Sequence, residues 1–150
     1  MKTLVVTVLF SVAAVLSVSC EIDIKKPSKE TLASFTEMFP DAFGTEWERE
    51  NGGLFKAEFQ VDGAETEAWF SRDGEWQRTK VEVSLAEVPE AVRSVINDFA
   101  DGTWETDEID HYFQASGIPE YYRVEFDKEN SHAERHLRVR PDGTVITDLR

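Results

Sequence analysis

Two histidines and a glutamate near the C-terminus form the best candidate for metal chemistry in this chain. The segment is His132-x-Glu134-x-His136. If it is a β-strand, alternate side chains point to the same face, so both imidazoles and the carboxylate would lie together. Such groups can hold zinc or a similar ion, although no fourth ligand is evident. The competing interpretation is an exposed hairpin edge with no metal.

Catalytic motifs are otherwise missing from the sequence. Cys20 is the only cysteine, and the chain contains no Gly-x-Ser-x-Gly elbow, phosphate-binding glycine loop or His-Glu-x-x-His pair. Aspartate and glutamate are abundant, at 30 residues, so carboxylates will lie close together on any fold. A catalytic pair needs a cleft that shifts one pKa, and short hairpins do not indicate one. We therefore expect a protein that is not an enzyme and uses no cofactor.

Aromatic and arginine side chains predict a protein-binding face instead. In the segment that contains Phe70, strand alternation places Trp69 opposite the core, and the same count turns Tyr121 outward. Aromatic and arginine residues together are typical of binding hot spots. The alternative is that the aromatics only pack across strands or under loops. The predicted binding face comprises Trp69, Trp76, Tyr121, Arg72, Arg78, Arg123 and Arg138.

The charge balance narrows the class of partner. The chain has 16 basic and 30 acidic residues, which gives a formal net charge of −14. A surface this acidic repels phosphate backbones and anionic lipids, so nucleic-acid binding is excluded. Acidic side chains would instead steer a basic partner toward the protein. We expect the partner to be an exported or envelope protein, which the sequence does not identify.

The first twenty residues have the layout of a signal peptide. Lys2 precedes an apolar run from Leu4 to Leu16, and small residues lead to Cys20. The run is shorter than the ~20 residues that span a bilayer. A lone cysteine here predicts a lipoprotein acylated on Cys20, and ordinary cleavage beside Cys20 is the alternative. We expect an exported protein, in the periplasm or as an envelope lipoprotein, that meets the membrane only through this anchor.

The remainder divides into a tether at residues 21–27 and one domain at residues 28–150. Within the domain, residues 28–83 and 84–150 show similar patterns. Each half has an amphipathic segment (32–43 and 88–99) followed by alternating segments that end in Asp-Gly turns. The predicted fold class is α+β, a tandem repeat of one helix plus a four-stranded antiparallel β-meander. The strands would form one continuous antiparallel sheet with both helices on one face.

Two short motifs, each present once in each half, carry a family resemblance. The segment 54–59 (LFKAEF) matches 121–126 (YYRVEF), and 68–74 (AWFSRDG) matches 137–143 (LRVRPDG). With the signal peptide, this pattern resembles the PepSY-like, β-lactamase-inhibitor-like domains of exported Bacteroides-type proteins. The resemblance implies a helix-plus-sheet architecture and a sheet surface that binds proteins. The inhibitor that gives the group its name is disulfide-bonded, which this chain cannot be.

The sequence therefore predicts a non-enzymatic exported binding module that acts through its open sheet face. Its role would be to inhibit or modulate an envelope enzyme by covering it. The alternative is a periplasmic metal or small-molecule sensor that uses His132, Glu134 and His136.

Overall fold

The computed structural model describes residues 26–100, 102–115 and 117–149. The predicted signal peptide (1–20), the predicted lipidation site Cys20 and residues 21–25 of the predicted tether lie outside these residues. No helix in the described part of the chain is long and apolar enough to cross a membrane.

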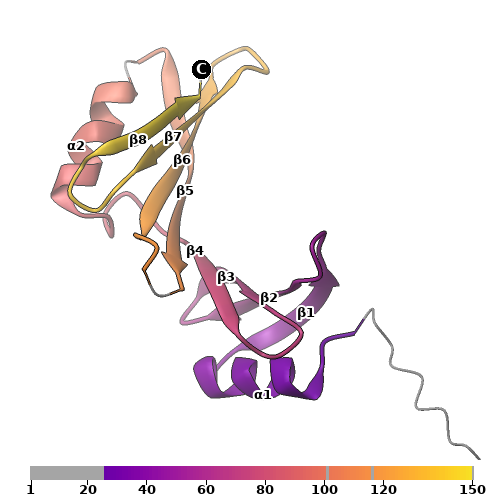
Figure 1. The fold of residues 1–150 in the computed structure, drawn as a ribbon. Helices are drawn as coiled ribbons and strands as arrows, with labels where there is room; N and C mark the ends of the chain where they lie inside the picture. The colour runs from indigo at the N-terminus through magenta and orange to yellow at the C-terminus, as the bar shows by residue number, and fades with distance from the viewer. Residues whose placement is uncertain (1–25, 101, 116, 150) are drawn as a thin grey trace, which may run out of the picture.

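Eight strands form one antiparallel sheet, and each strand pairs with the next along the chain (Figure 1). A ten-residue helix precedes the first strand, and another stands between the fourth and fifth. The elements are α1 (Lys29–Met38), β1 (Phe43–Arg49), β2 (Phe55–Val61), β3 (Ala64–Phe70), β4 (Trp76–Glu82), α2 (Glu90–Phe99), β5 (Trp104–Gln114), β6 (Tyr121–Lys128), β7 (Glu134–Val139) and β8 (Val145–Leu149).

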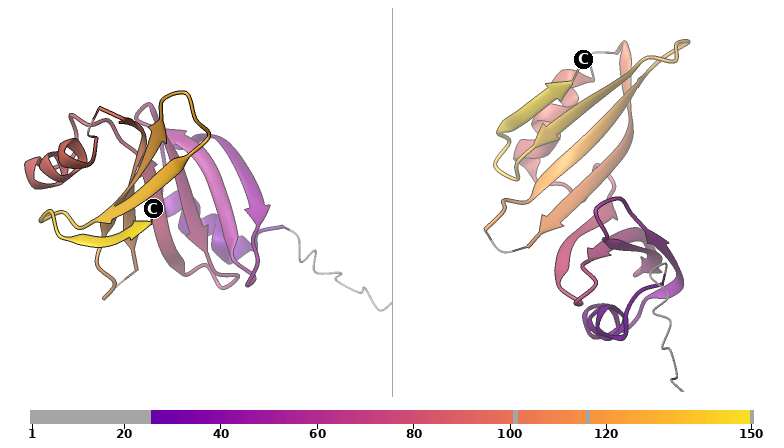
Figure 2. Two further views of the ribbon diagram at one scale, coloured as in Figure 1. Left: turned by 90° about the horizontal axis from the view of Figure 1, so that it is seen from above. Right: turned by 45° about the vertical axis from the view of Figure 1, so that its right-hand side comes forward.

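The predicted fold class is wrong. The chain is a mostly β domain built on one eight-stranded sheet, not a tandem repeat of helix-plus-meander units with both helices together on one face. Strands β5–β8 are turned strongly against β1–β4 (Figure 2). Because β-sheets twist, α1 lies below the first four strands while α2 lies beside the last four, and no common helical layer forms.

Each helix covers its own hydrophobic core. Under α1, Phe35 packs among Ala57, Phe59, Ala68 and Phe70, and we call this set the N-terminal cluster. Under α2, a separate cluster contains Val88, Val92, Ile96, Trp104, Ile109, Tyr122, Val124, Phe126, Leu137 and Val139. The predicted alternation in β2 is confirmed, since its core residues are buried while the intervening side chains are more exposed. Because alternate side chains of a strand point to opposite faces, Lys56 and Glu58 lie on the face of the sheet away from this core.

A polar cap fixes the start of α1 against the β3–β4 turn. The Ser28 side chain accepts a hydrogen bond from the Thr31 backbone N–H at 3.0 Å, as helix N-caps do. Its hydroxyl also donates to the carbonyl of Arg72, and the Thr31 hydroxyl donates to the carbonyl of Ser71. Gly74 in this turn lies so close to α1 that a Cβ would meet the Glu30 carbonyl oxygen at 2.7 Å. The turn and the helix are therefore packed as one unit.

The first helix is shorter than the apolar spacing predicts. It ends at Met38, and Pro40 follows two residues later, where it cannot continue the helix. Phe43 begins β1 instead and is 58% exposed. This places an exposed apolar ring on β1, an edge strand of the sheet.

Candidate functional site

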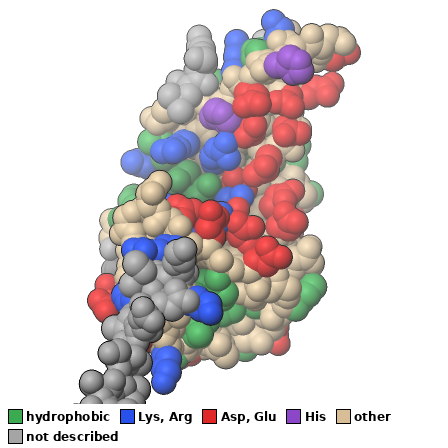
Figure 3. Space-filling view, turned by 90° about the vertical axis from the view of Figure 1, so that its right-hand side faces the viewer, with side chains coloured by type: hydrophobic (Ala, Val, Ile, Leu, Met, Phe, Trp, Pro, Cys, Tyr) green, Lys and Arg blue, Asp and Glu red, His purple; other side chains and the backbone are tan. Residues whose placement is uncertain are grey.

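The side chains that alternate with core residues across the strands form a surface that we call the charged face. Carboxylates dominate it, and Figure 3 shows them gathered on one side of the molecule with lysines and arginines beside them. By register, the charged face contains Glu46, Glu48, Lys56, Glu58, Glu67, Trp69, Arg78, Lys80, Glu82, Glu108, Asp110, Tyr112, Tyr121, Arg123, Glu125, Glu134, His136 and Arg138.

Lys80 is enclosed by three carboxylates at the centre of this face. Its Nζ lies 2.7 Å from Glu67 Oε1, 3.6 Å from Asp110 Oδ1 and 3.8 Å from Glu108 Oε1. Burial disfavours the ammonium, but the hydrogen bond to Glu67 and the neighbouring negative charges outweigh it, so the Lys80 pKa is raised. Lys80 is therefore a fixed positive charge already matched by its neighbours.

Asp110 is buried although it belongs to the charged face. It is 1% exposed, and Arg123 Nη1 lies 3.3 Å from its Oδ2. Its other oxygen, Oδ1, is buried without a hydrogen-bond partner among the described residues and faces the Lys80 ammonium. Burial, followed by the hydrogen bond with Glu108, raises the Asp110 pKa to about 7 against the opposing charges of Lys80 and Arg123.

Trp69 lies on the charged face, as predicted, but is not accessible. It pairs across the strands with Arg78, whose Cζ lies 4.2 Å from the centroid of the indole ring. Only 4% of Trp69 is exposed. The prediction that Trp69 is an accessible anchor for a partner is therefore wrong, because the guanidinium covers it.

Trp76 lies on the core side of the sheet. The β3–β4 register shifts so that Phe70 pairs with Trp76 while Trp69 pairs with Arg78. The extra residue in β4 is a β-bulge, and it turns Trp76 to the opposite face from Arg78. Its ring packs against the N-terminal cluster, and Nε1 donates to Thr79 Oγ1 at 2.8 Å. The prediction that Trp76 belongs to the binding face is wrong.

Tyr121 and most of the predicted arginines do lie on the charged face. Tyr121 stacks on Tyr112, with ring centroids 4.8 Å apart and planes 10° apart, and Arg138 lies over it at 5.3 Å. Arg123 occupies the centre of the β6–β7 region. Arg72 is the exception, because it lies in the β3–β4 turn beside α1. Whether these residues bind a partner stays a prediction.

The predicted metal ligands are only partly brought together. His132 lies in the turn before β7, so it does not share a strand face with Glu134 and His136. Glu125 joins those two instead, and one ligand atom from each lies within 4.8 Å of the others. Arg123 Nη2 is 2.7 Å from Glu125 Oε2 and 3.2 Å from His136 Nδ1. A guanidinium therefore occupies the place that an ion would need.

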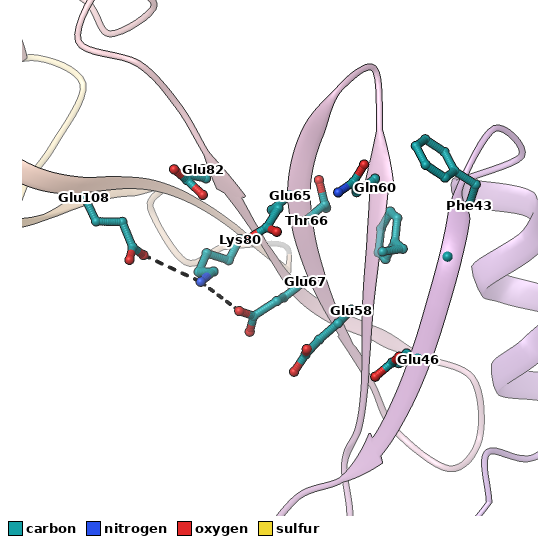
Figure 4. A pocket seen from close by; sticks show the side chains of 12 residues that line it. Phe43, Glu46, Glu58, Gln60, Glu65, Thr66, Glu67, Lys80, Glu82 and Glu108 are labelled. Atoms are coloured by element: carbon teal, nitrogen blue, oxygen red, sulfur yellow. Dashed lines mark ion pairs between the residues drawn. The ribbon is translucent and has the colours of Figure 1, made fainter.

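A hollow of about 360 Å³ opens on the charged face between β1 and β5. Six glutamates and Lys80 are among its twelve lining residues, and Phe43 and Gly44 belong to its β1 side. Figure 4 shows the carboxylates following one another across the strands toward Lys80. The glutamates are Glu46, Glu58, Glu65, Glu67, Glu82 and Glu108. The sequence alone does not reveal this group, because each strand by itself shows an ordinary solvated face and only the strand register brings the glutamates together.

Comparison with known proteins places the fold in a family. Residues 54–146 match the model of the family described as "Putative beta-lactamase-inhibitor-like, PepSY-like". The chain belongs to this PepSY-like family. The resemblance stated from the sequence is thereby confirmed. The family description likens its members to inhibitors, which are binding proteins rather than enzymes. None of the curated proteins matches the chain.

Solved structures from Bacteroides share the PepSY-like fold. A DUF2874 family protein from Bacteroides ovatus has a TM-score of 0.74 at 21% identity, covering 82% of this chain and 86% of its own. A protein of Bacteroides eggerthii, titled as one of the "putative periplasmic proteins", has a TM-score of 0.76 at 20% identity, with coverages of 82% and 88%. A BLIP-like protein from Bacteroides fragilis has a TM-score of 0.70 at 22% identity, with coverages of 82% and 85%. At these identities the likeness shows the fold alone.

Proposed function

We propose that this chain is a non-enzymatic binding module of the cell envelope that holds a protein partner against its charged face. The observation that carries the proposal is the continuity of this face across β1–β7, with its hollow and its excess of carboxylates. A cleft of one charge sign concentrates field lines and draws in a partner of opposite charge. The partner is therefore a protein with a basic surface.

Export of the chain supports an envelope location for this encounter. The apolar leader with Cys20 behind it is the layout of a signal peptide, and a structural relative is described as periplasmic. A module held there by a lipid on Cys20 would meet exported enzymes. Covering such an enzyme with the charged face would inhibit it sterically, in keeping with the inhibitor-like description of the family.

Affinity capture tests the proposal. The chain from Glu21 onward, which contains every described helix and strand, is crosslinked in envelope extract beside a variant that carries Tyr121→Ala, Glu46→Gln and Glu82→Gln on the charged face. Leu32→Ala with Met38→Ala, on the exposed side of α1, is the matched control. A protein captured by the wild type and the control but lost with the face variant supports the proposal. Equal capture by all three would reject it.

A metal-sensing function has one observation in its favour, the approach of Glu125, Glu134 and His136. Arg123 lies against two of these three side chains, which weakens the case. Calorimetric titration with zinc separates the two functions, because tight binding that depends on His136 would favour metal sensing.

A further inference from the structure

The charged face changes sign along the direction of its strands. In β2 the order is Lys56 and then Glu58, and in β7 it is Glu134 and then Arg138. Because neighbouring strands are antiparallel, the starts of β2, β4 and β6 lie at the same end of the face as the ends of β3, β5 and β7. We call this the cationic end, and its cationic and aromatic side chains are Lys56, Trp69, Arg78, Tyr112, Tyr121 and Arg138. The opposite, acidic end carries Glu58, Glu67, Glu82, Glu108, Glu125 and Glu134, and Figure 3 shows lysines and arginines to one side of the carboxylates.

Two arginines at the cationic end have no acidic neighbour. Lys56 Nζ lies 2.6 Å from Glu58 Oε1, and Arg123 and Lys80 also form ion pairs. Within the described residues, no ion pair joins Arg78 or Arg138 to a carboxylate. Their guanidiniums lie over aromatic rings instead, Arg78 over Trp69 and Arg138 over Tyr121. In a chain with 30 acidic and 16 basic residues, these two charges are left for an acceptor that the described chain does not supply.

Arg138 is the accessible member of the pair. Its side chain is exposed, whereas Arg78 is half-buried and is used to cover Trp69. Tyr121, which lies 5.3 Å from the Arg138 Cζ, is itself held in a stack on Tyr112 with planes 10° apart. These contacts restrict the guanidinium before a ligand arrives, so less side-chain freedom is lost on binding. Arg138 is therefore a preorganised and unpaired cation on an exposed part of the face.

The chemistry of Arg138 and its surroundings selects a carboxylate as the ligand. A guanidinium forms its strongest hydrogen bonds with planar carboxylates or with phosphates. A formal net charge of −14 and the acidic end of the same face repel a nucleic acid or an anionic lipid surface, which carries many phosphates. A single carboxylate within a basic protein surface avoids this repulsion, because the acidic end attracts the residues around it.

We propose that Arg138, supported by Tyr121, binds an aspartate or glutamate side chain of the partner protein, while the acidic end of the charged face binds basic residues of the same partner. Two regions of opposite sign on one face fix the orientation of a partner, which a uniformly acidic face does not. An accessible arginine beside an aromatic ring is also the composition of a binding hot spot. The proposal rests on the proposed function and adds one specific contact to it.

A peptide titration followed by NMR of the chain from Glu21 onward tests this contact. The probe is Lys-Ala-Glu-Ala-Lys, blocked at both ends, and its counterpart carries neutral glutamine in place of the glutamate. The lysines of both peptides offset the negative charge of the protein. We expect the glutamate peptide to produce saturable shifts in the Nε–H of Arg138 and in the backbone amide of Tyr121. The glutamine peptide should leave the Arg138 Nε–H unshifted.

Two charge-matched variants locate the binding, with the Tyr121 amide as the common signal. Arg138→Gln should weaken binding of the glutamate peptide about tenfold or more, because a charge-assisted hydrogen bond is lost. Arg49→Gln removes the same charge from an exposed position of β1 that pairs with the core residue Phe55 and so lies on the other face. This control should bind the glutamate peptide as the wild type does.

Three results would overturn the proposal: equal weakening by both variants, an equal shift of the Arg138 Nε–H by the glutamine peptide, or no saturable shift. The result for the proposed function is separate. If the peptide fails while capture still depends on Tyr121, Glu46 and Glu82, the Arg138 contact falls and the proposed function stands. If the peptide binds as expected while capture is equal for all three proteins, the proposed function fails although Arg138 binds a carboxylate.

Discussion

Arg78 lies over the indole of Trp69, with its Cζ 4.2 Å from the ring centroid, and this contact buries a tryptophan on the charged face. The two residues are directly opposite in the β3–β4 ladder. A guanidinium on an aromatic face is attracted by the ring quadrupole, and the attraction grows when the pair loses water. The pair therefore serves the sheet's own packing and gives the charged face a cationic surface where an aromatic one was expected.

Replacing Arg78 by alanine should uncover Trp69 and destabilise the fold by about 1–2 kcal/mol. Acrylamide quenching of tryptophan fluorescence should increase, because one more indole becomes accessible. The chain has four tryptophans, so the same measurement on Arg78→Ala combined with Trp69→Phe isolates the signal. If quenching increases equally with and without Trp69, the contact does not control its exposure.

The sequence pattern predicted the positions of the strands better than it predicted the face of the sheet to which each side chain points. In β2, the alternation of Phe55, Ala57 and Phe59 with charged residues predicted the buried side correctly, because this strand pairs without interruption with β3. In β4, period-two counting would put Trp76 and Arg78 on the same face, but the two side chains lie on opposite faces. A β-bulge inserts one residue between them, and period-two counting cannot detect it.

The candidate site was hidden for a related reason. The glutamates of the hollow come from β1–β5, and each strand segment shows a polar residue at every second position, as any solvated strand does. Only the cross-strand register reveals that Glu46, Glu58 and Glu67 stand in one row. Register depends on turn geometry and bulges, which composition does not determine. The excess of acidic residues predicted that the site would carry negative charge, but not where on the sheet it would lie.

Replacing Trp76 by alanine should cost much more unfolding free energy than replacing Tyr121 by alanine. Trp76→Ala removes an indole that packs on the N-terminal cluster and leaves the Thr79 hydroxyl without its donor, so we expect a loss of about 2–3 kcal/mol in unfolding free energy. Tyr121→Ala removes a stack on Tyr112 and should cost about 1 kcal/mol or less. Urea unfolding of both variants measures the difference. Equal losses would mean that Tyr121 is a core residue and a poor choice as a probe of binding.

Asp110 should make stability fall as the pH rises from about 4 to about 7. In this window the folded protein keeps the proton, since the Asp110 pKa is raised to about 7, while the unfolded chain loses it near its ordinary value. The native state then binds more protons than the unfolded state, so unfolding free energy decreases by up to about 1.4 kcal/mol per pH unit from this group. Lys80, Glu108 and Arg123 around it, and Glu82 opposite it, set the local charge.

Asp110→Asn removes this titration and should flatten the difference in stability between pH 5 and pH 8 relative to the wild type. Urea unfolding at both pH values measures the unfolding free energy of each protein. The lost ion pairs lower this free energy at both pH values, so the test is the difference between pH 5 and pH 8. Asp98→Asn on the exposed side of α2 is the control and should follow the wild type. If the stability of Asp110→Asn changed with pH as much as that of the wild type, Asp110 would not be the group that causes the pH dependence.

Removing Arg123 should improve zinc binding at Glu125, Glu134 and His136. Its guanidinium contacts Glu125 and His136, so it competes with an ion for their lone pairs and adds a repelling charge. By calorimetry we expect Arg123→Met to bind zinc at least about tenfold more tightly than the wild type. Adding His136→Ala should abolish the gain, and Arg138→Met should not reproduce it. Tight, His136-dependent zinc binding by the wild type would instead favour the metal-sensing function.

Two glycines in hairpin turns offer a matched test of how α1 is held. The φ angles of Gly63 and Gly74 are 83° and 84°, so alanine at either position is strained by about 1–2 kcal/mol. A Cβ on Gly63 meets nothing within 4 Å, whereas one on Gly74 meets the Glu30 carbonyl carbon at 2.8 Å and oxygen at 2.7 Å. Gly74→Ala must therefore push the turn away from α1 as well.

We expect Gly74→Ala to lower the unfolding free energy by about 1–3 kcal/mol more than Gly63→Ala does. Hydrogen exchange should locate the extra loss in α1, because the Ser28 and Thr31 hydrogen bonds to the β3–β4 turn loosen together with the clash. Their loss would uncover Phe35 and open the N-terminal cluster. Similar stability losses in the two variants, with α1 protected in both, would mean that the helix moves freely over the turn and that its polar cap does not anchor it.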